Sequence, residues 1–162
     1  MKWNQLLAYA AEDLALEQGL TEETGHTGPA PGLSTMQTRI AKFGTFTSTI
    51  GENVAYGTTG GKEIVLQLII DDGVPNRGHR TNILKPEFLA LGSWSSGHLT
   101  FSSETVIDYA GGMTTNDARA PLKNYDCTTG QGVLASNATA STNSTCVAST
   151  TTEAQAAAAA AA

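Results

Sequence analysis

The stretch that decides the fold lies between residues 51 and 92. It reads GENVAYG at 51–57, then an apolar run at 64–70, then the acids Asp71 and Asp72, then RGHRTNILKPEFLALG at 77–92. Glu52, the two acids and His79 stand on separate local elements that are close in sequence, so folding can bring them together. The most apolar segment of the chain joins them, and a polar cluster braced by a buried helix is a rigid site. We therefore expect the rest of the chain to be organised around this stretch.

Length and composition bound what the chain can be. Its 162 residues fit one domain with a respectable core. Hydrophobic residues make up 40% and charged residues 15%, and the net charge is -6. A nucleic-acid binder is excluded, because no Lys/Arg cluster could neutralise several phosphates. No apolar run approaches the ~20 residues that span a bilayer, so we expect no transmembrane segment.

The N-terminal half is expected to be mainly helix and loop. Apolar residues at helical spacing predict an amphipathic helix over residues 3–18, closed by Gly19. Residues 21–38 are rich in Thr, Gly and Pro, which predicts a loop that carries His26. Residues 39–43 are expected to form a short helical turn ended by Gly44.

The central stretch offers acids whose positions matter. Gly51 permits a sharp turn and Asn53 can bond its own main chain, so we expect Glu52 in a turn. Residues 62–72 read as a helix buried on most sides, although a short apolar run could also be a strand. Asp71 and Asp72 end this segment, where a helix dipole disfavours negative charge. A histidine cation, a metal, Arg77 or Arg80 would compensate them; the alternative is that both face water.

The remaining sequence predicts strands and then a change of character. Residues 89–94, 99–102 and 105–110 are expected to be three strands, with a turn at 95–97 and the domain ending at Gly112. His98 flanks a strand, where a structural role is favoured. From Thr114 the composition turns to Thr, Ser and Ala, ending in seven alanines, which predicts a disordered tail over residues 113–162.

This tail carries features of a secreted glycoprotein. Asn137 and Asn143 stand in glycosylation sequons. Cys127 and Cys146 are the only cysteines and are expected to pair in the secretory route, an intermolecular bridge being the alternative.

The quoted motifs resemble a known family. GENVAYG and RGHRTNILKPEFLALG, with Gly25-His26-Thr27-Gly28, Arg39-Ile40 and Phe43-Gly44 upstream, are similar to the CAP superfamily of SCP-like (TAPS) extracellular domains. The similarity spans roughly residues 3 to 112 and is greater to the cysteine-poor branch of bacteria and some unicellular eukaryotes. It implies an α+β fold, an α-β-α sandwich with a central, mainly antiparallel sheet, and a helix at 62–72. We expect the domain to occupy residues 1–112. Since the family normally has another helix first, this sequence is expected to begin inside the domain.

The resemblance also implies a cleft lined by two histidines and two acids. His26, Glu52 and His79 match three of the four, and in some members a divalent metal, usually zinc, binds at the histidines. The fourth is normally Glu; here Asp71 matches, with Asp72 as rival. Asp71 is preferred because it shares a helix stripe with Leu68.

Several functions remain open for such a cleft. Two imidazoles make a weak zinc site, because catalytic zinc usually takes three protein ligands. Our first expectation is a secreted binding or effector domain with a small-molecule, lipid or protein ligand. One alternative is a metal-dependent hydrolase or protease, with Glu52 as general base toward a zinc-bound water. The other is sterol or lipid binding, which the resemblance implies for some members.

Overall fold

The structure is a computed structural model that describes residues 1–28, 32, 34–115, 125–126 and 131–132. The chain divides into two compact units, Met1–Arg119 and Ala120–Ala162. In the second unit, β7 (Tyr125–Asp126) pairs with β8 (Gln131–Gly132) in antiparallel fashion. The predicted glycans at Asn137 and Asn143 and the predicted Cys127–Cys146 bridge lie outside the described residues. So does the tail predicted to be disordered over residues 113–162, except for residues 113–115, 125–126 and 131–132, which form short strands.

The first unit is built around one mixed sheet. Its elements, in chain order, are β1 (Lys2–Trp3), α1 (Gln5–Thr21), α2 (Met36–Phe43), β2 (Gly44–Phe46), β3 (Ile50–Tyr56), α3 (Gly61–Ile70), α4 (Gly78–Leu84), β4 (Ala90–His98), β5 (Ser102–Ala110) and β6 (Met113–Thr115). The sheet has the strand order β1-β4-β5-β3. β5 is antiparallel to both neighbours, and β1 is parallel to β4.

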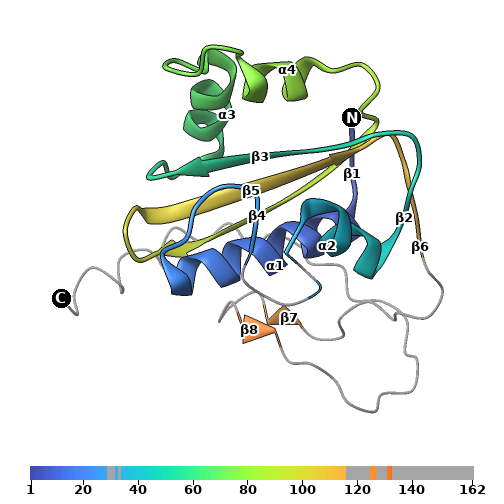
Figure 1. The fold of residues 1–162 in the computed structure, drawn as a ribbon, viewed down its shortest axis with the longest axis horizontal. Coiled ribbons are helices and arrows are strands. Elements are labelled where there is room, and N and C mark those ends of the chain that lie inside the picture. The colour runs from blue at the N-terminus through green and yellow to red at the C-terminus, as the bar shows by residue number, and fades with distance from the viewer. Residues whose placement is uncertain (29–31, 33, 116–124, 127–130, 133–162) are drawn as a thin grey trace. The chain divides into compact units, whose positions relative to one another are not determined.

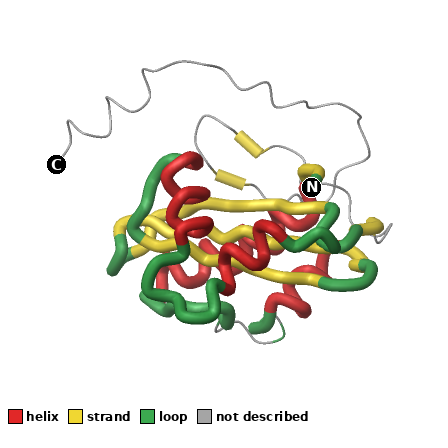
Figure 2. Tube along the Cα trace, turned by 90° about the horizontal axis from the view of Figure 1, so that it is seen from above, coloured by secondary structure: helices red, strands yellow, loops and turns green. Residues whose placement is uncertain are grey.

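Helices cover both faces of this sheet. α1 and α2 lie on one side and α3 and α4 on the other (Figure 1), and Figure 2 shows the same layers from above. The expected α-β-α sandwich with a mainly antiparallel sheet is confirmed. A separate pair, β2 with β6, joins Phe46 to Met113, so pairing continues beyond Gly112. The domain boundary expected at that glycine stays a prediction.

Helix α1 differs at both ends from the expectation. The Asn4 side chain caps it by accepting hydrogen bonds from the main-chain N–H groups of Leu6 (3.0 Å) and Leu7 (3.2 Å). This cap leaves Trp3 outside the helix, in β1. At the other end the helix continues through Gly19 to Thr21.

Two glycines let α1 lie very close to the sheet. A Cβ at Gly92 of β4 would collide with the main chain of α1 at Ala8 and with the carbonyl of Asn4. A Cβ at Gly19 of α1 would collide with the carbonyl oxygen of Gly97 in β4. The helix therefore contacts β4 main chain to main chain near both of its ends.

The C-terminal sheet is a hairpin of two long strands, so the prediction of three strands is wrong. Residues 95–97 continue β4, and the turn lies after His98. Both serines find hydrogen-bond partners: Ser95 Oγ lies 2.7 Å from Thr105 Oγ1, and Ser96 Oγ donates to the Ala15 carbonyl (2.8 Å). Polar residues that read as a turn are accommodated because the neighbouring elements supply their hydrogen-bond partners.

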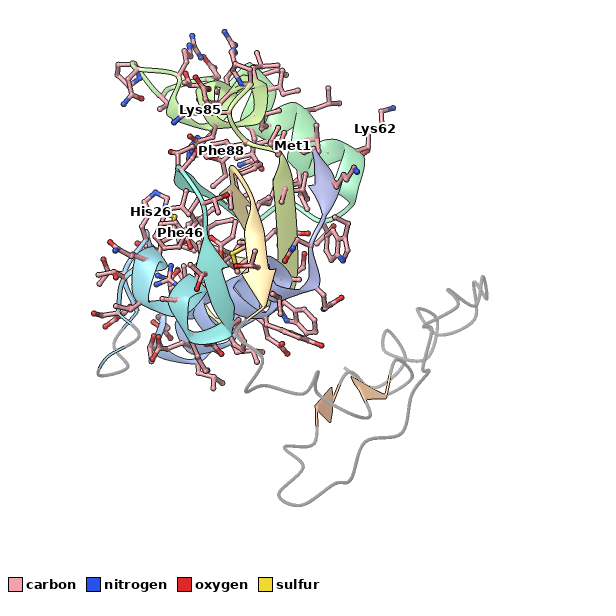
Figure 3. All side chains as sticks on the ribbon, turned by 90° about the vertical axis from the view of Figure 1, so that its right-hand side faces the viewer. Met1, His26, Phe46, Lys62, Lys85 and Phe88 are labelled. Carbon is pink, nitrogen blue, oxygen red and sulfur yellow. The ribbon has the colours of Figure 1, made fainter. Side chains whose placement is uncertain are left out.

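The expected turn at 51–53 is also wrong, because these residues lie within β3. At Gly51 a Cβ would enter the ring of Phe88, so the glycine makes room for an aromatic side chain. Figure 3 labels Phe88 beside Lys85, whose Nζ lies 4.8 Å from its ring centroid. Glu52 is consequently a buried strand residue.

The helix expected at 62–72 is present as α3, but it is not buried on most sides. Only Ile64 and Leu68 are buried, against Ala55 of β3. Val65, Leu66 and Ile70 are 44%, 46% and 56% exposed. α3 is an outer layer covered from one side, which leaves apolar surface beside the sheet edge.

Candidate functional site: two histidine–carboxylate pairs flanking strand β3

The first pair joins His26 to Glu52. His26 Nδ1 lies 2.9 Å from Glu52 Oε1, and the fully buried Arg39 places its Nη2 2.6 Å from Oε2. The His26 side chain is 57% exposed, whereas that of Glu52 is 2% exposed. The hydrogen bond that His26 donates to Glu52 raises the pKa of His26, although burial and Arg39 act against this rise. A buried carboxylate thus holds an accessible imidazole.

The loop that carries His26 is clamped from α1 and β3. Gln18 Nε2 donates to the carbonyls of Gly25 and Thr27, both at 3.1 Å, on either side of the histidine. Tyr56 donates its hydroxyl hydrogen to Gln18 Oε1 (2.8 Å) and accepts from the N–H of Gly25 (2.8 Å). Burial, chiefly, raises the pKa of Tyr56 to about 12, so this hydroxyl stays a donor at neutral pH. The main chain at His26 is therefore fixed by hydrogen bonds.

The second pair joins His79 to Asp71. Asp71 ends α3 in the left-handed region, with φ 54°, and this turns its carboxylate onto the start of α4. Oδ1 lies 2.7 Å from His79 Nδ1, while Oδ2 accepts from the N–H groups of His79 (3.0 Å) and Arg80 (3.2 Å). Burial acts to raise the pKa of Asp71, but the hydrogen bonds from His79 and Arg80 outweigh it and hold that pKa below its ordinary value.

Cations complete the charge balance at this turn. Arg77 donates to the Ile70 carbonyl (3.1 Å), and Arg80 donates to the carbonyls of Ile69 and Ile70. These are the last carbonyls of α3, where positive charge is favourable. The two arginine side chains therefore bond main-chain carbonyls and not the acid side chains that they were expected to compensate, whereas Asp71 is bonded by His79 and by the first N–H groups of α4. Asp72, by contrast, is exposed.

Two asparagines tie the site to β3. Asn53 Nδ2 donates to the His79 carbonyl (3.1 Å) and to the Tyr109 hydroxyl (3.2 Å). Asn82 Nδ2 donates to Asn53 Oδ1 (2.9 Å) and to the Glu52 carbonyl (3.1 Å). The Asn53 side chain thus forms a hydrogen bond to α4 and not, as predicted, to its own main chain.

Buried acids lie beside Glu52 on the α1 side of the sheet. Asp108 stands opposite Glu52 in the β3–β5 register and is fully buried. Burial first, and then the charge and hydrogen bond of Glu52, raise the pKa of Asp108 well above its ordinary value. Neither Asp108 oxygen finds a donor in the described part of the chain, so the protonated acid, donating to Glu52, is the consistent state. Because Asp108 keeps its proton, Asp108 and Glu52 together carry one negative charge, which Arg39 balances.

The two pairs lie on opposite faces of β3. Val54, two residues from Glu52, packs with Ala11 and Leu14 of α1, whereas Ala55 packs with Ile64 and Leu68 of α3. Glu52 and His26 therefore belong to the α1 face, and Asp71 and His79 to the α3–α4 face. Within the described ranges no three His, Cys, Asp or Glu side chains gather closely enough to hold a metal ion.

Beside the second pair lies a groove of about 220 Å³. It is lined by apolar atoms of β3, α3 and the following loop together with Asp71, Asp72 and His79. His98 is elsewhere and buried: its Nδ1 accepts from the N–H of Thr100 (3.2 Å), and its Nε2 lies 3.0 Å from the Glu23 carbonyl. Its ring also contacts Tyr56 and Phe101, which agrees with the structural role expected for it.

With this geometry described, comparison with known proteins gives the family. The chain belongs to the CAP family, the cysteine-rich secretory protein family, whose sequence model matches residues 1–98. No curated protein matches the chain. The helices of the described residues include none long and apolar enough to cross a membrane.

Solved structures show the same fold. An outer surface protein from Borrelia burgdorferi is 16% identical with a TM-score of 0.55, covering 68% of this chain and 76% of that one. An extracellular protein containing a SCP domain from Bacillus anthracis str. Ames is 21% identical with a TM-score of 0.52, covering 68% of this chain. The alignment spans 33% of that Bacillus protein.

Sequence reasoning missed the residues that position the histidines. Arg39, Tyr56 and Asn82 stand in the quoted motifs without an assigned role, and Gln18 stands in none of them. A signal existed for Tyr56: with Glu52 and Val54 it keeps the period of two that puts side chains on one face of a strand. No comparable signal existed for Gln18, because its partners are main-chain carbonyls of a loop.

Proposed function

We propose that the protein is a secreted binding or effector module whose ligand site is the edge of β3, flanked by two accessible imidazoles. The observation that carries the proposal is that each histidine is oriented by a buried carboxylate through Nδ1. Buried carboxylates that orient histidines are typical of ligand and metal sites. The printed names of the two similar structures, an outer surface protein and an extracellular protein, support location outside the cell.

The imidazoles suit a weakly bound divalent metal, with zinc as the preferred ion. With Nδ1–H donated to Glu52 or Asp71, Nε2 carries the lone pair that a metal needs. No described residue donates a hydrogen bond to either Nε2. Two ligands make a labile site, since firm structural or catalytic zinc takes three or four protein ligands. When bound, zinc would act as a Lewis acid and an anchor for ligand oxygen or nitrogen atoms.

The alternatives have less support. Glu52, the residue proposed as general base, already accepts from His26 at one oxygen and from Arg39 at the other, so a water would have to compete with both donors for its lone pairs. A groove of about 220 Å³ is below the ~300–1,000 Å³ of pockets that enclose small ligands, which argues against an enclosed sterol. Hydrolysis and sterol binding both remain testable alternatives.

Zinc titration by calorimetry on the full chain tests the proposal. Because the two imidazoles belong to opposite faces of β3, an ion that both bind would have to lie beyond the edge of this strand. For such a shared ion we expect one zinc per chain, abolished in both His26→Ala and His79→Ala and weakened in Asp71→Asn. Asp72→Asn is the matched control, because it removes the neighbouring charge without touching either histidine. Binding that survives one histidine substitution, or two independent sites, would contradict a shared ion. Peptide turnover by the zinc-loaded protein that is lost in Glu52→Gln would favour the hydrolase instead.

A further inference from the structure

Strand β3 is an edge strand whose outward main chain can be identified. The Gly57 N–H donates to the Ser103 carbonyl, and the Gly111 N–H donates to the Thr49 carbonyl, both at 2.9 Å. These two bonds mark hydrogen-bonded pairs of the antiparallel ladder, in which such pairs alternate with non-hydrogen-bonded pairs. By this alternation Asn53 and Ala55 bond to β5. The N–H and C=O groups of Glu52, Val54 and Tyr56 point away from the sheet.

Most of these outward groups have no partner among the described residues. The Glu52 carbonyl accepts from Asn82, which closes one end of the edge. For Val54 and Tyr56, no main-chain hydrogen bond on the outward side is made by any described residue. Unpaired donors and acceptors along an edge are a template for an added strand.

The groove begins at this edge. Val54 lines it together with α3 residues, yet the Val54 side chain packs on the other face, with α1. What Val54 presents to the groove is therefore its main chain. The opposite wall is apolar at Leu68 and Ile70, the latter 56% exposed. Edge and wall together fit a polypeptide that offers a main chain to β3 and apolar side chains to α3.

Charge indicates what kind of polypeptide fits. Asp71 is buried and hydrogen-bonded to His79, whereas Asp72 in the same groove is exposed and forms no ion pair within the described residues. The chain as a whole carries -6. A second copy paired edge to edge would bring two such acidic walls together, whereas a basic segment complements them.

We propose that the free edge of β3 binds an extended, basic segment of another polypeptide as an added strand, with its apolar side chains against α3. The inference rests on the proposed function as a binding module and names its ligand class. Recognition by main-chain pairing gives affinity, while the groove selects alternate side chains.

The test uses a fluorescent, end-capped peptide of about eight residues with alternating valine and lysine, and anisotropy is measured in EDTA. In a strand, side-chain direction and main-chain direction both alternate with a period of two, so all valine amides face one way and all lysine amides the other. Only one of these two sets of amides can face β3. N-methylation of the set that pairs with β3 should reduce affinity at least about tenfold, and methylation of the set that faces away should reduce it less than about twofold. Equal effects of the two methylations would overturn the proposal.

Variants of the protein supply the second arm. Asp72→Asn should weaken binding about threefold or more at low salt, and an alternating valine and glutamate peptide should bind at least about tenfold more weakly. Glu63 is another exposed acid, but it lies on α3 outside the groove lining. Glu63→Gln should therefore leave affinity unchanged. No binding at about 1 mM peptide, or equal effects of the two variants, would refute the inference.

The outcomes separate the two proposals. Loss of peptide binding with zinc binding intact refutes only the added strand. Peptide binding without any zinc uptake refutes only the metal. If sedimentation shows a dimer that the peptide does not dissociate, the edge belongs to a second copy and the proposal fails.

Discussion

Replacing Glu104 by glutamine should stabilise the protein in a pH-dependent way. Glu104 lies on β5 between Tyr56 and Ser96, is fully buried, and neither of its oxygens finds a donor among the described residues. Burial, and then the charge of Glu52, raise its pKa from 4.5 to about 7. The carboxyl group thus stays protonated in the folded protein where an unfolded chain would ionise it.

The sign and size follow from this shift. Between about pH 4.5 and 7 the unfolded state loses the proton first, so the free energy of unfolding falls as pH rises through that window. At ~1.4 kcal/mol per pH unit the full shift corresponds to ~3 kcal/mol, of which we expect ~2 kcal/mol to appear in the stability. Glutamine is neutral throughout, so Glu104→Gln should gain ~2 kcal/mol near pH 8 and almost nothing near pH 4.5.

Urea denaturation followed by tryptophan fluorescence at the two pH values measures the difference. Glu63→Gln is the matched control, because Glu63 is an exposed acid on the first turn of α3. It should change stability little at either pH. A Glu104→Gln protein that is less stable near pH 8, or whose gain is the same at both pH values, would refute the idea that Glu104 is held protonated.

Three further expectations concern the site and the domain boundary. Gln18→Ala should lower zinc affinity about tenfold by freeing the loop around His26, with folding checked by circular dichroism; an unchanged affinity would show that the clamp is dispensable. Because Glu52 raises the pKa of His26, zinc affinity should begin to fall already above about pH 6.5 as the pH is lowered, and Glu52→Gln should move the His26 titration, followed by NMR, downward. Ending the chain after residue 115 should leave Tm nearly unchanged, whereas ending it after Ala110 removes β6 and should lower Tm; a large drop in the first case would show that later residues stabilise the domain.

Local sequence pattern predicted part of this fold, and the resemblance to a family supplied its layers. The period of 3.6 was sufficient to place α1, whereas the run of α3 fitted a helix or a strand until the resemblance favoured a helix. Of the strands, the pattern placed the second half of β5 but divided β4 and missed β3. The run at 64–70 could not reveal that three of its apolar residues stay exposed, because an apolar residue type does not say which element, if any, packs against it. Ser95 and Ser96 read as a turn since their partners, Thr105 and Ala15, are remote in sequence.

The histidine pairs were predictable only in part. His26, Glu52 and His79 were found through motif similarity, and a helix stripe favoured Asp71 over Asp72 for the cleft. Asp71 is indeed buried, but it lies just after α3 in the left-handed region, and its membership of a cleft stays a prediction. Pairing His26 with Glu52 and His79 with Asp71 on opposite faces of one strand could not be foreseen, because the sequence was taken to place Glu52 in a turn. The role of Glu52 as a member of a zinc or catalytic cleft stays a prediction.

The contact of α1 with β4 through Gly19 and Gly92 makes the site sensitive to a distant methyl group. Apolar side chains along α1 can exchange for others of similar volume, and the helix will settle on the sheet again. An alanine at position 92 has no such freedom, because it would meet the helix main chain itself and lift α1 off the strand. Gln18 would move with the helix, and the His26 loop with Gln18. Among natural variants, a substitution at this glycine should therefore disturb the imidazole more than many changes much nearer to it.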